Sequence, residues 1–514
     1  MKRYFLGIDI GTFESRGILI DESFRVAADA SVPHGMDNPQ PGWFEQEAEA
    51  VWWGDLCKLC RTLIKQSGIR PEQIACVGTS ALGTDCLPVD EQCRPLRPAI
   101  LYGIDARASE EAAWLTEHYG QARVQELFGH PICSGDTATK ILWLRRHEPE
   151  IYAKTAYFLT GSSFLTARLT GKYVIDQALA KGSFRPLYQA DGSVNEAECG
   201  LYCRPDQIAA CAWSTDIVGT VTPEAAAQTG LAAGTPVITG TGDSTAEAIS
   251  VGLVEPGTAF FQYGSSMFYY YCTDHFVGSY VSPQGNGALK GGKAFTVPGT
   301  YCLGDGTNAA GTLTRWVRDL LYSKELDAEK QGGENAYAVM AREAAAVPPG
   351  SDGLIMLPYI YGERSPLQDA EATGMLFGLK GMHGRAQINR AALEAVGYST
   401  YQHLLLFEEL GVPPRRIITA GGGTKNAAWM QIICDMAGMP LTIPEPFQCS
   451  SYGDAMLAAL GVGALESFSA LRAALPQGRI LQPDRKNHEF YQEHYPIFRD
   501  LYLENRDRMH RMQK

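Results

Sequence analysis

The chain has 514 residues, of which 45% are hydrophobic and 20% are charged, as is typical of a globular protein with about two to four domains. Its 57 acidic residues outnumber the 44 basic ones and give a formal net charge of −13, so the sequence predicts no nucleic-acid or anionic-membrane partner. No apolar run approaches the ~20 residues that cross a bilayer, and Gly7 and Asp9 interrupt the apolar N-terminal stretch. We therefore expect a soluble, cytoplasmic protein.

The 13 cysteines are scattered along the chain and odd in number, unlike a disulfide framework. Cys57 and Cys60 form a CxxC pair without the second pair that would complete a zinc site. Cys199, Cys203 and Cys211 form a looser group, and no histidine follows them at ligand spacing. The pattern predicts reduced thiols packed inside the protein.

In chain order, the first predicted element is a strand, turn and strand unit over residues 4–21, with its turn at Gly11-Thr12. A similar unit recurs at 258–272, where a Gly-Ser-Ser turn separates two aromatic strands. A third strand and Gly-rich turn at 416–426 leads into a segment with helical spacing of apolar residues. These three units predict an α/β protein.

The recurrence of the hairpin unit near the start of each half predicts two related domains, 1–250 and 251–514. Short β-runs such as 353–358 alternate with helical segments such as 385–410. The C-terminal tail carries aromatic residues at helical spacing and predicts a terminal helix, although Pro496 lies inside the pattern and counts against an uninterrupted one.

Three turns rich in glycine, serine and threonine follow predicted strands: Gly11-Thr12, Gly264-Ser265-Ser266 and Gly421-Gly422-Gly423-Thr424. Such turns expose backbone N–H groups and let an anion approach closely. Each alone is more often ordinary turn chemistry, but their joint occurrence indicates phosphate binding. Neither Gly-Lys pair of the chain is followed by the serine or threonine of a Walker A motif.

Carboxylates lie beside one of these turns and at a predicted junction between a strand and a helix. Asp9 ends the first strand, where it could hold Mg²⁺ against a bound triphosphate. Asp243 lies between a strand-like and a helical segment, where a carboxylate can accept a proton from a hydroxyl; the alternative is a helix N-cap. Asp85, Asp105 and Arg107 are loop charges after β-runs, and the local sequence does not separate substrate ligands from surface charges there.

These segments resemble the FGGY family of carbohydrate kinases, which share the fold of actin, hexokinase and the heat-shock chaperone ATPases. GIDIGT at 7–12 is similar to the family's first phosphate loop, and GTGDSTAEAISVG at 240–252 is similar to the block with its catalytic aspartate. GERSP at 362–366, followed by GGGTKN and SYGDAMLAALGVG, is more specific and looks most like the xylulokinase-related branch. The resemblance implies two actin-like (ribonuclease H-like) domains with a cleft between them.

The same resemblance implies a sugar kinase that uses ATP and Mg²⁺. Asp243 would be the general base that deprotonates the sugar hydroxyl, and Asp9 would order the Mg²⁺. The nucleotide would contact Thr12, Gly264, Ser265, Ser266, Gly311, Gly422, Gly423 and Asn426. The sugar would contact Asp243 and two sugar-side segments through Gly83, Thr84, Asp85, Asp105 and Arg107.

Both sugar-side segments depart from the pattern of many xylulokinases. Gly83-Thr84-Asp85 stands where those proteins have Met-His-Gly, and residues 102–107 read Tyr-Gly-Ile-Asp-Ala-Arg instead of a segment with Trp-Asn-Asp-Gly-Arg. D-xylulose is the expected sugar, and another ketose, a polyol or a sugar acid remains an alternative. An ATPase or sugar sensor that transfers nothing is a further alternative, which the retained Asp243 disfavours. The oligomeric state is left open, with a homodimer as one alternative.

Overall fold

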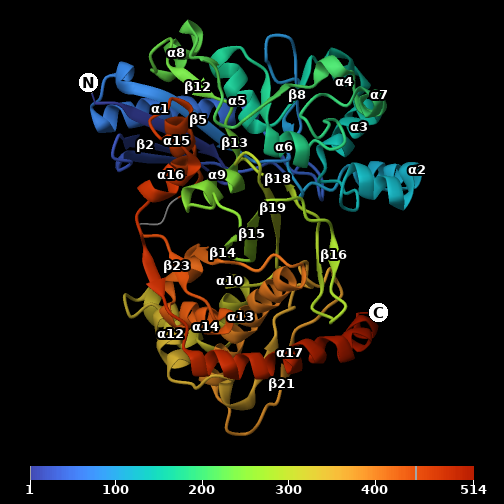
Figure 1. Ribbon diagram of the computed structural model, residues 1–514, viewed down its shortest axis with the longest axis vertical. Helices are drawn as coiled ribbons and strands as arrows, with labels where there is room; N and C mark the ends of the chain where they lie inside the picture. Colours follow the sequence, from blue (N-terminus) through green and yellow to red (C-terminus); the bar gives the residue numbers. More distant parts are fainter. Residues whose placement is uncertain (1, 446–448, 514) are drawn as a thin grey trace. The chain divides into compact units, whose positions relative to one another are not determined.

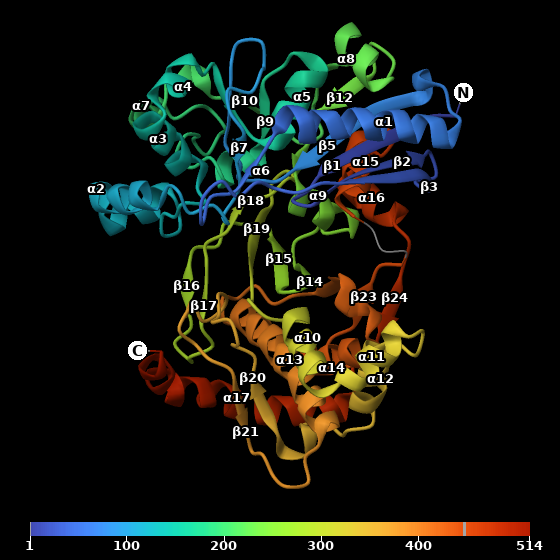
Figure 2. The ribbon, with the colours of Figure 1, turned by 180° about the vertical axis from the view of Figure 1, so that it is seen from behind.

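The structure is a computed structural model and describes residues 2–445 and 449–513. The chain folds into two units, drawn in Figures 1 and 2. Unit 1 comprises Met1–Val254, Lys293–Tyr301 and Gln448–Leu475, and unit 2 comprises Glu255–Gly292, Cys302–Phe447 and Pro476–Lys514. The first crossing of the chain, after Val254, lies close to the expected boundary at 250. The later return of two segments to unit 1 differs from the expected simple division into halves.

Unit 1 is built on a mixed β-sheet. Its strands lie in the order β11 (Ile217–Thr220), β12 (Pro236–Ile238), β5 (Ile74–Ala81), β1 (Tyr4–Ile10), β2 (Glu14–Asp21) and β3 (Val26–Pro33). The neighbours β1, β2 and β3 run antiparallel, whereas β1 and β5 run parallel. The first two strands are the hairpin that the sequence predicts around Gly11-Thr12.

The register of this sheet brings polar residues together at one end of adjacent strands. Asp9 of β1 lies opposite Ser80 of β5, and Ser80 also lies opposite Thr241 of the short strand β13 (Thr241–Gly242). Helix α9 (Asp243–Ser250) begins directly after β13. Because these strand ends meet at the same edge, Asp9, Ser80 and Asp243 are neighbours although they are distant in sequence.

Two helices cover opposite faces of the sheet, α1 (Gly54–Ser67) and α15 (Ser450–Gly461), as the two opposite views show (Figures 1 and 2). The strand β1 is therefore apolar on both faces, and Phe5, Leu6 and Ile8 are buried. The helix α15 comes from near the C-terminus, yet it packs against β1, β5 and α9.

Glycines allow α15 to approach the sheet backbone to backbone. A Cβ atom on Gly7 would lie 1.9 Å from the carbonyl oxygen of Ser451, and one on Gly78 would lie 2.4 Å from that of Asp454. A Cβ atom on Gly453 would lie 1.9 Å from the carbonyl oxygen of Ala246 in α9. Only glycine fits at these positions, and this close packing is the physical reason why a C-terminal segment belongs to unit 1.

Unit 2 repeats the hairpin and parallel-strand pattern. Its sheet has the order β19 (Tyr301–Gly306), β15 (Met267–Thr273), β14 (Thr258–Tyr263), β22 (Arg416–Ala420), β23 (Leu441–Ile443) and β24 (Arg479–Leu481). The hairpin β14–β15 is antiparallel, and β14 runs parallel to β22. This matches the relation of β1 to β2 and β5 in unit 1, as expected for two domains of related fold.

Helices α13 (Arg385–Glu409), α14 (Ala427–Ala437) and α17 (Arg485–Met512) form much of unit 2, and all three were expected. The tail residues Tyr491, Tyr495, Phe498 and Tyr502 are buried. Pro496 lies inside α17, which is a single helix. Within residues 2–445 and 449–513, no helix combines the length and apolar character needed to cross a membrane.

The remaining helices belong to the same two units. In unit 1 they are α2 (Ser109–Leu127), α3 (Thr137–His147), α4 (Pro149–Lys154), α5 (Gly161–Thr170), α6 (Gln177–Gly182), α7 (Glu196–Tyr202), α8 (Pro223–Thr229) and α16 (Phe468–Ala474). In unit 2 they are α10 (Gly311–Leu321), α11 (Ser323–Lys330) and α12 (Ala336–Ala345).

Short strands complete both units. Unit 1 contains the pairs β4 (Glu45–Gln46) with β7 (Ala99–Ile100), β6 (Leu87–Val89) with β8 (Tyr157–Leu159), and β9 (Val174–Asp176) with β10 (Ala210–Ala212), together with β18 (Lys293–Ala294). Unit 2 contains the pairs β16 (Tyr280–Val281) with β17 (Ala288–Leu289), and β20 (Ile355–Leu357) with β21 (Met375–Phe377).

Candidate active site

A group of carboxylates lies where β1, β5 and β13 end in unit 1. The hydroxyl oxygen of Ser80 lies 2.8 Å from Oδ1 of Asp9. The side chain of Asp243 accepts a hydrogen bond of 2.6 Å from the backbone N–H of Ser244. Gly242, not Asp243, is the N-cap of α9, and Asp243 is the first residue of the helix. The N-cap alternative for Asp243 is therefore not supported.

Burial makes both of these carboxylates better proton acceptors than an exposed aspartate. It raises the pKa of Asp9 to about 7, and the negative charge of Asp243 contributes to the shift. Burial also raises the pKa of Asp243, while the N–H of Ser244 and the charge of Lys293 oppose the shift. A general base is most effective when its pKa lies near the working pH, so the environment of Asp243 suits proton abstraction.

The turn at Gly11-Thr12 is held by hydrogen bonds within unit 1. Nε2 of Gln46 donates to the carbonyl oxygen of Thr12 at 2.9 Å, and Nε2 of His34 lies 2.9 Å from that of Gly11. The hydroxyls of Thr12 and Tyr102 lie 3.2 Å apart. The turn is therefore fixed in place beside Asp9, as a phosphate-binding turn requires.

The segment Gly83-Thr84-Asp85 is anchored by a lysine that the sequence analysis did not single out. Nζ of Lys140, in α3, donates to the carbonyl oxygen of Thr84 at 2.6 Å and to that of Gly135 at 3.0 Å. Lys140 and Asp85 are both fully buried. The signal that could have identified it is a lone charged residue in the otherwise uncharged helical segment TATKILWL.

Asp85 is buried without the hydrogen bonds that its carboxylate would be expected to form. Neither oxygen has a hydrogen-bond partner in the part of the chain that the structure describes. Burial raises its pKa well above the ordinary value, whereas the positive charge of Lys140 opposes the shift. The contact of Asp85 with a sugar, which the sequence predicts, would require its carboxylate to become accessible.

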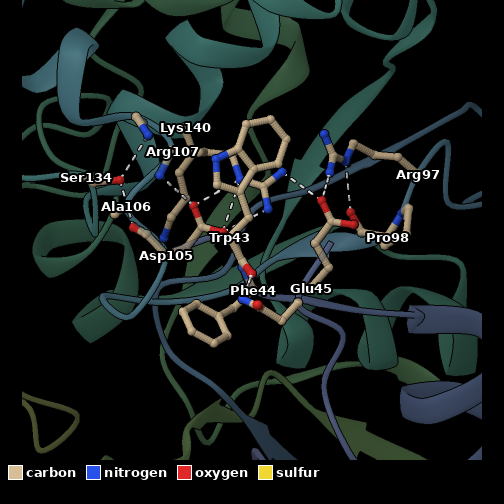
Figure 3. Close-up of polar contacts among 12 residues, drawn as sticks. Trp43, Phe44, Glu45, Arg97, Pro98, Asp105, Ala106, Arg107, Ser134 and Lys140 are labelled. Carbon is tan, nitrogen blue, oxygen red and sulfur yellow. Dashed lines mark hydrogen bonds and ion pairs between the residues drawn. The ribbon is translucent and has the colours of Figure 1, made fainter. Parts of the chain in front are cut away.

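Asp105 and Arg107, which the sequence predicts to contact the sugar, are held by other residues of unit 1 (Figure 3). Nη2 of Arg107 lies 2.8 Å from Oδ2 of Asp105, and Nη1 lies 2.7 Å from Oε1 of Glu45. Asp105 Oδ2 also accepts from the backbone N–H of Phe44 at 2.7 Å, and the guanidinium of Arg107 stacks 4.3 Å from the ring centre of Trp43. These contacts fix the loop that carries the pair and occupy hydrogen-bonding groups that a sugar would otherwise use.

In unit 2, a cavity of about 490 Å³ collects most of the residues expected to bind the nucleotide. The expected residues in its wall are Gly264, Ser265, Gly311, Gly422, Gly423 and Asn426. The wall also contains Arg315, Asn335, Tyr337, Asn389, Lys425 and Trp429, among others, which the sequence analysis did not predict. The structure thus brings two predicted Gly-rich turns to a single cavity.

The backbone of the Gly264-Ser266 turn is docked on the start of α10. The carbonyl oxygen of Ser265 accepts from the N–H groups of Ala310 at 3.1 Å and Thr312 at 2.9 Å, and that of Gly264 accepts from the N–H of Gly311 at 3.0 Å. Ser266 closes the turn, because its carbonyl oxygen accepts from the N–H of Gly264 at 2.9 Å. Ser266 is not part of the cavity wall, and Thr12 belongs to unit 1.

The two glycines at the other turn have different constraints. A Cβ atom on Gly423 would lie 2.8 Å from Cβ of Tyr263 and 2.9 Å from a ring carbon of Trp429. A Cβ atom on Gly422 would meet no atom within 4 Å in the described chain. Asn426 caps α14 by accepting from the N–H of Trp429 at 3.0 Å. Gly423 is therefore needed for packing, whereas Gly422 borders empty space that a ligand can fill.

The metal and cysteine predictions can also be compared with the structure. Among residues 2–445 and 449–513, no cluster of three or more histidine, cysteine, aspartate or glutamate side chains is arranged to hold a metal ion. Mg²⁺ in nucleotide enzymes commonly uses only one or two carboxylates together with substrate phosphates, and the oxygen donors around Asp9 fit that pattern. The thirteen cysteines are free thiols and most are buried, as predicted, whereas Cys133 is exposed.

Comparison with known proteins identifies the family. The N-terminal domain of the FGGY family of carbohydrate kinases matches residues 4–250, and the C-terminal domain of that family matches residues 263–462. The chain belongs to the FGGY family of carbohydrate kinases. This confirms the resemblance seen in the sequence, and the protein is a sugar phosphotransferase with an actin-like, two-domain α/β fold.

Relatives named as kinases of different sugars match this FGGY kinase with about equal sequence identity. The xylulose kinase of Escherichia coli K12 is 29% identical over 501 residues, which cover 97% of this chain and 98% of that protein. The gluconokinase of Bacillus subtilis 168 is 28% identical over 506 residues, which cover 98% and 96%. The crystal structure of xylulose kinase from Rhodospirillum rubrum superposes with a TM-score of 0.88 at 28% identity, covering 99% of this chain and 100% of that one.

Proposed function

We propose that this FGGY kinase transfers the γ-phosphoryl group of ATP to a hydroxyl of a ketopentose, with D-xylulose as the best candidate. The observation that carries the proposal is the position of Asp243, a partly buried carboxylate that begins α9 at the strand ends beside Asp9. The similarity to xylulose kinases over nearly the whole chain supports the choice of sugar.

Asp243 acts as the general base in this proposal. Its carboxylate accepts the proton of the attacking hydroxyl as the bond to the phosphoryl group forms. Phosphoryl transfer passes through a loose transition state, so positioning and charge neutralisation matter more than a strong base. A carboxylate with a raised pKa is sufficient for that task.

Asp9 is the residue proposed to hold Mg²⁺, directly or through water. The ion would supply charge neutralisation on the β- and γ-phosphates. The backbone around Gly11-Thr12 orients the first phosphate-binding turn beside Asp9, and the hydroxyls of Ser265 and Ser266 supply donors at the second. The glycine-lined cavity of unit 2 would hold the adenosine.

The charges around the sugar-side segments favour a neutral sugar over a sugar acid such as gluconate. A substrate carboxylate needs a cation with free hydrogen-bonding capacity. The ammonium of Lys140 is engaged by two carbonyl oxygens and by the charge of Asp85, and the guanidinium of Arg107 is engaged by Asp105 and Glu45. We assign Asp85 and Lys140 to shaping the Thr84 turn against the sugar.

A substrate panel tests this proposal. ADP release is coupled to an optical assay with D-xylulose, L-xylulose, D-ribulose, xylitol and D-gluconate, and without any sugar. A ketopentose should give a kcat/KM at least about tenfold above that for gluconate, corresponding to ~1.4 kcal/mol of discrimination. Preference for gluconate would favour the sugar-acid alternative, and turnover without sugar would favour a simple ATPase.

A further inference from the structure

One buried carboxylate beside the site has no assigned role. Asp454 lies on α15, in the segment that returns to unit 1 from the C-terminal part of the chain, and it is fully buried. Its Oδ2 lies 2.6 Å from the hydroxyl oxygen of Ser80. The same hydroxyl oxygen lies 2.8 Å from Oδ1 of Asp9. Ser80 therefore bridges two carboxyl groups.

Counting protons shows that this bridge cannot join two ionised carboxylates. A serine hydroxyl has one proton to donate, and an ionised carboxylate can only accept. Both short contacts are satisfied only if one carboxyl group keeps its own proton and donates it to the oxygen of Ser80. The serine proton then goes to the other carboxylate.

The surroundings indicate that Asp454 is the protonated partner. Its Oδ1 has no hydrogen-bond partner within the described residues, which would be very costly for an ionised group in the interior. Burial, with contributions from the charges of Asp9 and Asp243, raises the pKa of Asp454 well above its ordinary value, although hydrogen bonds to Ser80 oppose the shift. The order of donors is then Asp454 to Ser80, and Ser80 to Asp9.

The packing of α15 holds this chain of hydrogen bonds in place. The carbonyl oxygen of Asp454 lies where a side chain on Gly78 of β5 would stand, and that of Ser451 lies where a side chain on Gly7 of β1 would stand. The helix backbone is thus seated directly on the two strands that carry Ser80 and Asp9. This seating fixes the backbone that carries Asp454 against the strand that carries Ser80.

We propose that Asp454 is a positioning residue, which donates a hydrogen bond through Ser80 and so fixes the orientation of the Asp9 carboxylate for the magnesium–nucleotide complex. The inference rests on the proposed function, because it takes Asp9 as the residue that meets the ion. It extends that function to a segment about 450 residues from Asp9 in sequence. In this proposal Asp454 acts only through Ser80.

The test compares replacements that keep or remove the donor. Asp454→Asn retains an N–H donor for Ser80, whereas Asp454→Leu and Ser80→Ala remove the connection. Calorimetry measures the affinity for ADP over a series of Mg²⁺ concentrations, and the Mg²⁺ dependence of kcat and KM is measured in parallel. Leu457→Ala, a buried replacement on the same helix, is the matched control for loss of stability.

We expect Asp454→Leu and Ser80→Ala to weaken magnesium-dependent ADP binding by roughly tenfold, as for loss of a hydrogen bond to a charged group. Asp454→Asn should stay within about threefold of the native protein, since the donor remains. The double variant Asp454→Leu with Ser80→Ala should be no worse than either single variant, because both break one chain. Leu457→Ala should lower the melting temperature without changing the Mg²⁺ dependence.

Three results would overturn the inference. If Asp454→Asn is as defective as Asp454→Leu, an ionised carboxylate is needed and the order of donors is wrong. If Asp454→Leu and Ser80→Ala behave like Leu457→Ala, Asp454 serves stability alone. An Asp9→Ala variant with native Mg²⁺ dependence would refute both the inference and the role given to Asp9. Native magnesium-dependent ADP binding without phosphorylation of any sugar would refute the proposed function but leave the Asp454 comparison valid.

Discussion

At the scale of single residues, the proposed chemistry depends on two carboxylates, Asp243 and Asp9, whose protonation is shifted by burial. Asp243 and Asp9 both have raised pKa values because they are withdrawn from water. If Asp243 is the general base, the acidic limb of the pH–rate profile lies closer to neutral pH than it would for an exposed aspartate. Below the pKa of Asp243 the carboxyl is protonated and cannot accept the hydroxyl proton, so kcat/KM should fall as the pH falls.

Replacing the base should separate catalysis from binding. Asp243→Asn keeps the shape of the side chain but cannot accept a proton, so kcat should fall by about 10²–10⁴-fold. Sugar and nucleotide affinity, measured by calorimetry, should change little. Near-normal turnover of a purified, folded variant would remove Asp243 from its assigned role.

Gly422 offers a clean test of the nucleotide cavity. A side chain there meets no protein atom within the described residues, so Gly422→Val should leave stability nearly unchanged and raise the KM for ATP far more than the KM for sugar. Gly381→Val is the matched control, because Gly381 also borders open space in unit 2 but lies outside the cavity wall. Equal effects on both substrates would indicate a folding defect instead of a blocked cavity.

The buried pair of Asp85 and Lys140 should be sensitive to the loss of one partner. Asp85→Ala removes a buried carboxyl group whose neighbour Lys140 is equally buried, and should destabilise the protein by roughly 1–3 kcal/mol, measured by urea unfolding. The double variant Asp85→Leu with Lys140→Met should recover much of that loss. Asp85→Ala should also flatten discrimination across the sugar panel, because Lys140 anchors the Thr84 turn. An unchanged ranking of sugars would reduce Asp85 to a structural role.

At the scale of elements, hairpins and Gly-rich turns were predictable because their signals are local. The strands around Gly11-Thr12 and Gly264–Ser266, and helices α13 and α14, follow from short-range patterns of apolar residues and glycine. The role of α15 was not predictable, because no local sequence pattern shows that its backbone packs directly on Gly7 and Gly78. The contacts of the Asp105–Arg107 pair were not predictable for a similar reason, since its partner Glu45 is distant in sequence.

His403 on α13 should make stability depend on pH. Its Nδ1 lies 2.7 Å from the carbonyl oxygen of Ser399 and must donate, so Nε2 accepts from the hydroxyl of Ser365 at 2.8 Å and the ring is neutral. Burial lowers its pKa to about 4 from the ordinary 6.5. The unfolded chain therefore binds a proton first as the pH falls, and the native state loses stability between these values.

The size of this effect follows from the shift. The loss should approach about 3 kcal/mol on going from pH 7 to pH 4, since each pKa unit corresponds to ~1.4 kcal/mol. The measurement is the free energy of unfolding against pH for the native protein and for His403→Gln. The difference in unfolding free energy between the two proteins should change between pH 7 and pH 4. A difference that stays constant over this range would show that His403 does not titrate as described.

At the scale of the whole molecule, the groups proposed to act on the sugar belong to unit 1, and the nucleotide cavity belongs to unit 2. Transfer requires the γ-phosphoryl group to reach the sugar hydroxyl, and a ligand set that engages both units favours a closed state. Small-angle scattering with sugar and a non-hydrolysable ATP analogue should give a smaller radius of gyration than the free protein. Identical profiles with both ligands bound would argue against closure.

The central claim is that the protein phosphorylates a sugar at the expense of ATP, and the most direct test observes the product. Phosphorus NMR of a reaction with ATP, Mg²⁺ and D-xylulose follows ADP, inorganic phosphate and sugar phosphate together. The account predicts one sugar phosphate for each ADP, with almost no inorganic phosphate and almost no ADP when the sugar is omitted. Release of ADP with inorganic phosphate, and without a sugar phosphate from any member of the panel, would contradict it.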